Sequence, residues 1–230
     1  MREIIVIQCA HGKRDLEPWH YDGREIKFVA NPTKCKEPGP NVCYYRPDDR
    51  IPGITMSCRE ILNQYNESRE EIPGFFQSTS FKKAYELYMN PIYKDLVSEF
   101  KEDCVFILSA GWGLVRSDYL LPSYNITFSR SARVCNKRTE DDFSWCDYSQ
   151  MENMALGKED KIYFFGTSAY RPLYYHLTCK VAGTKKVYYC GTNKPEEATE
   201  YEGQGYKYEW YRNKPFQNWP YVCAKERLLK

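Results

Sequence analysis

The residues best suited to chemistry lie just after the first apolar run of the chain. His11, Lys13 and Asp15 place an imidazole, an amine and a carboxylate within five residues. Imidazoles and carboxylates commonly move protons in enzyme sites, and a cation stabilises negative charge that develops during a reaction. These three residues are therefore candidate catalytic groups. The alternative is that this charged segment is an ordinary solvated turn, and the sequence leaves both interpretations open.

A second segment, residues 106–129, contains the groups needed to hold an aromatic ligand. It reads FILSAGWGLVRSDYLLPSYNITFS. Glycines on both sides of Trp112 allow a tight turn, and a later proline fixes the path along which Tyr124 and Asn125 return. A ring and an amide can stack on a nucleobase and read its edge. The alternative is that Trp112 and Tyr124 plug the end of a sheet.

Other polar residues could bind phosphate or assist in base binding. Ser168 follows a third apolar run just before an expected helix, where backbone N–H groups can receive an anion. The basic residues that we expect to contact phosphates are Arg116, Arg130, Arg133, Arg171 and Lys194. The net charge of +2 argues against a tail that binds polyanions in bulk, but it leaves room for a local basic groove.

Neither cofactors nor disulfides are expected. The chain has no Walker loop, GxGxxG, GxSxG or HExxH motif, so nucleotide hydrolysis and dinucleotide redox chemistry lack support. The 10 cysteines include no CxxC pair, and several lie at the edges of apolar runs, where a free thiol acts as a small hydrophobe. A zinc site assembled from distant residues is the alternative, and its candidate ligands are Cys9, His11, His20, Cys35 and Cys43.

Four short apolar runs must position these groups, at residues 4–8, 105–109, 162–165 and 187–190. Continuous apolar runs of this length are typical of strands buried on both faces of a parallel sheet. Helical patterns occur near 80–88, 91–101, 148–156 and 170–178. The alternation predicts an α/β three-layer sandwich with a short, mostly parallel, four-stranded central sheet. In such folds ligands bind at the carboxyl ends of the strands, where the polar segments lie.

The length of 230 residues predicts a single domain. Residues 31–58 are rich in Pro and Cys and are expected to form an insertion, and the chain from about 195 is an aromatic, polar extension without a firm assignment. The N-terminal apolar run is too short for a signal peptide or a membrane span. We therefore expect a soluble, cytoplasmic protein with no membrane partner.

Several segments together resemble the YaaA-like domain family. These are IIVIQCAHGKRD, ELYMNPIYKDL, ILSAGWGLVRSD and LPSYNITFS, which cover the first apolar run and roughly residues 80–128. The resemblance implies a fold like that of uracil-DNA glycosylase and a link to DNA binding or nucleobase chemistry. It would make the His11–Asp15 and Trp112–Asn125 segments the walls of the binding pocket. The chain departs from the family pattern because Ser123 separates Pro122 from Tyr124, and the motifs that excise uracil are missing.

The favoured interpretation is a DNA glycosylase that excises an unusual or modified base, which would suit defence against phage with modified DNA. Double-stranded DNA would be the partner, with the base flipped out and stacked on Trp112 or Tyr124. Asn125 would read its edge, Asp15 would stabilise charge on the sugar or position a water, and His11 or Lys13 would assist the departing base. The alternatives are a non-catalytic DNA-binding protein of the YaaA-like kind and a ribosyltransferase that processes nucleosides or nucleotides.

Overall fold

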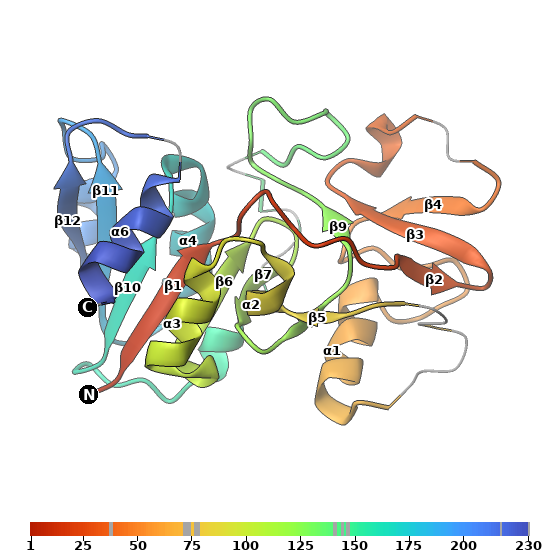
Figure 1. The fold of residues 1–230 in the computed structure, drawn as a ribbon, viewed down its shortest axis with the longest axis horizontal. Helices are drawn as coiled ribbons and strands as arrows, with labels where there is room; N and C mark the ends of the chain where they lie inside the picture. Colours follow the sequence, from red (N-terminus) through yellow and green to blue (C-terminus); the bar gives the residue numbers. More distant parts are fainter. Residues whose placement is uncertain are drawn as a thin grey trace.

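The main sheet has six strands and forms the centre of the protein (Figure 1). The computed structural model describes residues 1–36, 39–70, 75, 79–139, 142–143, 145, 148–216 and 218–229. The strands lie in the order β12-β11-β10-β1-β6-β7. Their bounds are β1 Glu3–Gln8, β6 Val105–Ser109, β7 Gly113–Arg116, β10 Lys161–Phe165, β11 Thr184–Cys190 and β12 Tyr206–Arg212. All neighbouring strands pair in parallel except β6 and β7, which are antiparallel.

The strand count differs from the four that the sequence predicts. The four apolar runs do form β1, β6, β10 and β11, but β7 and β12 extend the sheet at its two edges. An edge strand keeps one side toward solvent, and β12 mixes buried and exposed residues along its length. A search for continuous apolar runs selects strands buried on both faces and therefore misses such edges.

Helices cover both faces of the sheet, so the expected layered α/β architecture is present. Helices α3 (Ile92–Phe100) and α6 (Trp219–Leu228) lie on one face, and α4 (Arg171–Thr178) lies on the other (Figure 1). The helix expected near 80–88 is reduced to α2 (Ala84–Leu87), because Lys82–Lys83 form the short strand β5 and pair with β8 (Leu120–Leu121). The segment near 148–156 contains only the 3-10 turn η3 (Gln150–Asn153).

The order of the parallel strands creates a topological switch point beside β1. From β1 the chain crosses to β6 on one side and then returns past β1 to β10, β11 and β12 on the other. This is the doubly wound order 2-1-3-4-5, in which connections leave neighbouring strands in opposite directions. Ligand sites in such sheets form at that crevice, outside the carboxyl ends of the strands.

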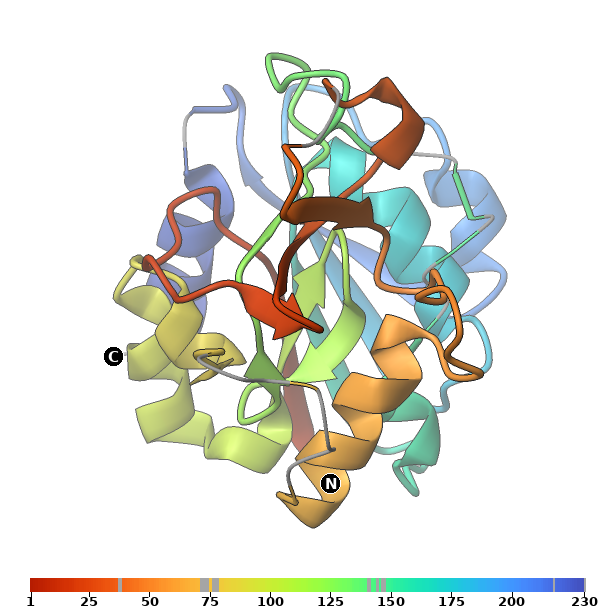
Figure 2. The same cartoon turned by 90° about the vertical axis from the view of Figure 1, so that its right-hand side faces the viewer.

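A second, smaller sheet lies beside the main one, at the right of Figure 1 and toward the viewer in Figure 2. It contains β2 (Trp19–Tyr21), β3 (Arg24–Val29), β4 (Val42–Tyr45) and β9 (Tyr124–Asn125). Strands β4 and β9 both pair in parallel with β3, so the region near 31–58 is bound into this sheet. Helix α1 (Cys58–Ser68) follows it, and its N-terminus is closed by a capping box between Ser57 and Glu60.

The C-terminal region is part of the main fold, because β12 extends the sheet and α6 packs on β1 and β10. It also contains the short helix α5 (Ala198–Glu202), which packs against β12. Many of the 21 tyrosines are packing residues. Tyr174 stacks on Phe164 at 4.0 Å, and Tyr175 stacks on Tyr201 at 3.9 Å between ring centroids. Within the described part of the chain, no helix is both long and apolar enough to cross a membrane.

Candidate functional site: a basic cleft at the strand ends

A cleft of about 990 Å³ lies between the segment after β1 and the second sheet. Its lining comes from segments that are far apart in the sequence: the β1 exit, β3, the η1 turn (Pro32–Lys34), β9 and the chain near 133–136. Half of the twelve residues predicted from the sequence as site residues line it together: His11, Lys13, Asp15, Tyr124, Asn125 and Arg133. The fold therefore assembles the candidate catalytic groups and part of the candidate binding groups in one place.

The cleft is strongly basic. Six of its lining residues are Lys or Arg, and two are Asp or Glu. Lys27 is paired with Glu25, at 3.3 Å between Nζ and Oε1. Four exposed cations form no ion pair with any described residue: Arg14, Lys34, Lys36 and Arg133. Unpaired cations around a concave surface attract an anionic ligand.

Lys13 lies at the inner side of the cleft, over aromatic rings. Its Nζ is 4.3 Å from the ring centroid of Tyr124 and 6.0 Å from that of Tyr88. The hydroxyls of these two tyrosines share a hydrogen bond of 2.5 Å, and Tyr124 also shares one of 2.9 Å with the Ser109 hydroxyl at the end of β6. Burial raises the pKa of both phenols well above the usual range, so both stay neutral. Burial also lowers the pKa of the Lys13 amine, although the nearby Cys9 thiol acts in the opposite direction.

The switch point itself is filled by buried polar side chains. The Gln8 side-chain oxygen accepts from the backbone N–H of Thr167 at 2.7 Å, which links the exits of β1 and β10. The Cys9 thiol and the Tyr170 hydroxyl lie 3.1 Å apart, and the Tyr221 hydroxyl donates to the Cys9 carbonyl at 3.1 Å. Because this network occupies the crevice, the open cleft lies to the side of β1 that faces the second sheet.

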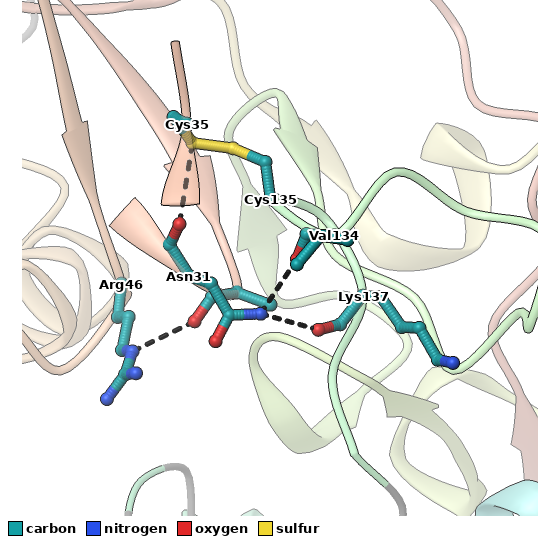
Figure 3. The surroundings of a disulfide bond; sticks show 7 residues. Asn31, Cys35, Arg46, Val134, Cys135 and Lys137 are labelled. Atoms are coloured by element: carbon teal, nitrogen blue, oxygen red, sulfur yellow. Dashed lines mark hydrogen bonds between the residues drawn. A yellow bond between two sulfur atoms is a disulfide. The ribbon is translucent and has the colours of Figure 1, made fainter. Parts of the chain in front are cut away.

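A disulfide between Cys35 and Cys135 holds the outer wall of the cleft (Figure 3). The expectation that the chain contains no disulfides is therefore wrong for this pair. The two cysteines are 100 residues apart in sequence, although their Cα atoms are only 4.9 Å apart. No local spacing of cysteines could therefore predict the bond. The Asn31 side-chain amide lies beside it and donates to the carbonyls of Val134 at 2.9 Å and Lys137 at 2.7 Å.

Trp112 does not line the cleft. Its side chain is fully buried, packed edge-on against Phe28 with ring centroids 5.0 Å apart. The ring offers no surface to a ligand, so the predicted stacking role is not supported and the alternative, a plug at the sheet end, describes its position. Two buried arginines hold the turn around it: Arg59 donates to the carbonyls of Gly111 and Trp112, and Arg138 donates to that of Ala110.

The remaining predicted site residues lie outside the basic cleft. Ser168 and Arg171 line a separate hollow of about 440 Å³ near the ends of β10 and β11. Arg171 is ion-paired with Glu197 at 2.6 Å, and Lys194 is paired with Glu202. Arg116, at the far end of β7, is paired with Asp118 at 2.6 Å. Arg130 is exposed and is not among the residues that line the cleft.

Sequence reasoning missed the cations of the η1 turn and its surroundings, Lys34 and Lys36. The sequence shows a lysine on either side of Cys35. Their place at the cleft could not be inferred from this pattern, because it depends on the disulfide that brings the turn there. Among the described residues, no group of three or more His, Cys, Asp or Glu side chains could hold a metal ion. The dispersed zinc set also loses Cys35 to the disulfide.

Comparison of the chain with protein-family models, curated proteins and solved structures finds no match. The resemblance to YaaA-like domains therefore stays a prediction based on the four sequence segments.

Proposed function

We propose that the basic cleft binds a nucleotide unit of DNA and that the protein hydrolyses its N-glycosidic bond, releasing an unusual or modified base. The observation that carries this proposal is the convergence of His11, Lys13 and Asp15 with Tyr124 and Asn125 in one cation-rich cleft. Proton-transfer groups, a ring, an amide and unpaired cations are the parts that a base-excising site needs.

The dimensions and charge of the cleft favour a nucleic acid over an isolated base. A volume of about 990 Å³ is at the upper end of the range of about 300–1,000 Å³ for small-molecule sites, so a bare base would leave most of it empty. The exposed cations Lys34, Lys36 and Arg133 would contact phosphates at the outer wall. Tyr124 and Asn125 would contact the base.

The proposed reaction replaces the C1′–N bond with a C1′–O bond. A water oxygen bonds to C1′, the bond electrons leave with the base nitrogen, and that nitrogen is protonated. Asp15 would stabilise the positive charge that develops on the sugar or orient the water, and His11 would supply the proton to the departing base. Lys13 would assist the departing base by donating a hydrogen bond to it. No cofactor is needed for this hydrolysis.

The test is a search for released bases. Purified protein is incubated with DNA from diverse sources, including phage DNA with hypermodified bases. Released bases are measured by mass spectrometry and abasic sites by alkaline cleavage. We expect one base to be released, and Asp15→Asn to slow its release by at least about 100-fold while DNA binding survives. Asp22→Asn is the matched control, because Asp22 is outside the cleft and its φ of 50° suits asparagine.

Absence of release from every DNA tested, with salt-sensitive binding intact, would contradict the enzymatic proposal and favour a non-catalytic DNA-binding protein. Turnover of free nucleosides or nucleotides that competing duplex DNA does not inhibit would instead favour the ribosyltransferase alternative.

A further inference from the structure

Lys13 differs from the other cations of the cleft in its surroundings. Its side chain is half-buried, whereas Lys34, Lys36 and Arg133 are exposed. Its Nζ lies over the rings of Tyr124 and Tyr88, and no carboxylate among the described residues is within ion-pair distance of it. Lys13 is also one of the residues that line the cleft. It therefore lies at the cleft wall while its side chain is partly removed from water.

The groups around the amine do not supply a negative charge that would hold its proton. Tyr88 and Tyr124 are neutral phenols, because burial raises the pKa of each. The Ser109 hydroxyl completes their hydrogen-bond chain. Only the Cys9 thiol favours the protonated amine, and burial outweighs it, so the pKa of Lys13 is lowered. The lowered pKa favours the neutral amine more than in an exposed lysine, and a neutral amine is a nucleophile for carbonyl carbons.

We propose that Lys13 forms a Schiff base with the C1′ aldehyde of an abasic sugar, which would give the protein a lyase activity that cuts DNA at abasic sites. This inference rests on the proposed function, because an abasic sugar is what removal of a base leaves in the cleft. The substrate class is the ring-opened deoxyribose of a DNA strand, held by its flanking phosphates.

The proposed step balances without an added oxidant or reductant. The lone pair of Lys13 Nζ forms a bond to C1′, and the aldehyde oxygen leaves as water after gaining one proton from the amine and one from solvent, which gives a protonated imine. The resulting imine draws electrons, so a base removes a proton from C2′ and the C3′–O bond breaks with the phosphate as leaving group. His11 and Asp15 line the same cleft and could accept that proton. Hydrolysis of the imine by water then restores the amine.

A second lysine gives an internal comparison. Lys185 on β11 is 3% exposed, lies 4.9 Å from the ring centroid of Tyr206, and has its pKa lowered by burial. It shares the electrostatic features of Lys13, but it lines neither the basic cleft nor the second hollow. If a low-polarity environment were sufficient for Schiff-base formation, both lysines would react. If a position at the cleft is also required, only Lys13 would react.

The experiment is reductive trapping with sodium borohydride. The whole protein is incubated with a duplex that contains one abasic site prepared in advance, and borohydride reduces any imine to a stable covalent adduct. We expect an adduct on Lys13, identified by mass spectrometry of the digested protein, and none on Lys185. Lys13→Arg should lower trapping and strand cleavage at least about 100-fold, because a guanidinium stays protonated. Lys94→Arg, a change of an exposed lysine on α3, should leave both unchanged.

Absence of any adduct, or an adduct only on another lysine, would overturn the inference. The peptide assignment is made on the unmodified protein, so it stands even if the Lys13 variant folds poorly. The result is also separate from that of the base-release assay. Base release without trapping would leave the glycosylase proposal intact and remove the lyase. Trapping on the prepared site without base release from any DNA would support the lyase and contradict the glycosylase proposal.

Discussion

The two walls of the basic cleft are held in place by different kinds of interaction. The inner wall follows β1, whose apolar residues Ile4, Ile5, Val6 and Ile7 are fully buried, and backbone hydrogen bonds continue past the strand from Cys9 to Leu108. The outer wall depends on contacts between segments distant in sequence. These include the disulfide, the Asn31 amide and the pairing of β9 with β3.

This difference predicts how each wall responds to change. The inner wall is supported by a packed core, so a single surface substitution should scarcely move it. The outer wall is supported by a few specific polar or covalent links, each of which can be removed by one or two substitutions. Loss of a link there should lower the free energy of unfolding and let the outer wall of the cleft move.

The largest expected effect on stability follows loss of the disulfide. Cys35→Ser with Cys135→Ser opens a loop of about 100 residues, and the free energy of unfolding should fall by about 4–5 kcal/mol. Denaturant unfolding with and without a reducing agent measures this change. The difference from the unmodified protein should disappear when the disulfide is reduced. Cys179→Ser is the control, since Cys179 is a free, exposed cysteine. An equal loss in the control, or no loss in the double variant, would contradict the role given to this link.

The next effect concerns the link between the main sheet and the segment after β4. Arg59 donates to the carbonyls of Gly111 and Trp112 and forms an ion pair with Asp48 at 2.5 Å. Arg59→Ala leaves buried acceptors without this donor and should lower the free energy of unfolding by about 3 kcal/mol. For a domain of this size the midpoint temperature should fall by about 6–12 °C.

Arg24→Ala is the matched control for Arg59→Ala, because Arg24 is an exposed arginine on β3 with no ion pair to a described residue. Its effect should stay within about 0.5 kcal/mol. Similar effects of the two substitutions would show that the buried position of Arg59 is not what matters.

The inner wall could be predicted from the sequence, and the outer wall only in part: Tyr124, Asn125 and Arg133 are predicted site residues that line it, but Lys34 and Lys36 are not. Apolar runs identify the four central strands, and the rule that ligands bind at the ends of parallel strands places His11, Lys13 and Asp15 at the site. Both steps depend on local patterns. Lys34 and Lys36 reach the cleft only because Cys35 is bonded to a residue 100 positions away, and no local pattern encodes that distance.

Trp112 shows a second limit of sequence reasoning. A tryptophan between two glycines fits an exposed stacking platform as well as a core plug. The choice depends on Phe28, Arg59 and the second sheet, which cover the ring in the fold. The cations raise a similar problem. The sequence predicts that Arg171 and Lys194 bind phosphate, but in the fold they are ion-paired with Glu197 and Glu202.

The central claim is that the basic cleft binds DNA through both of its walls. Its most direct test is the salt dependence of DNA affinity for a variant that lacks the exposed cations of the outer wall, Lys34→Ala/Lys36→Ala/Arg133→Ala. The matched control removes three exposed lysines that do not line the cleft, Lys94→Ala/Lys158→Ala/Lys180→Ala. Both variants lose the same formal charge, so they differ in where the charge is lost.

If the cleft binds DNA, the cleft variant should lose at least about tenfold in affinity, and the slope of log affinity against log salt should become shallower by about 2 to 3. The control variant should keep a slope close to that of the unmodified protein. Equal slopes for the two variants, or an unchanged slope for the cleft variant, would contradict the claim that this cleft is the DNA site.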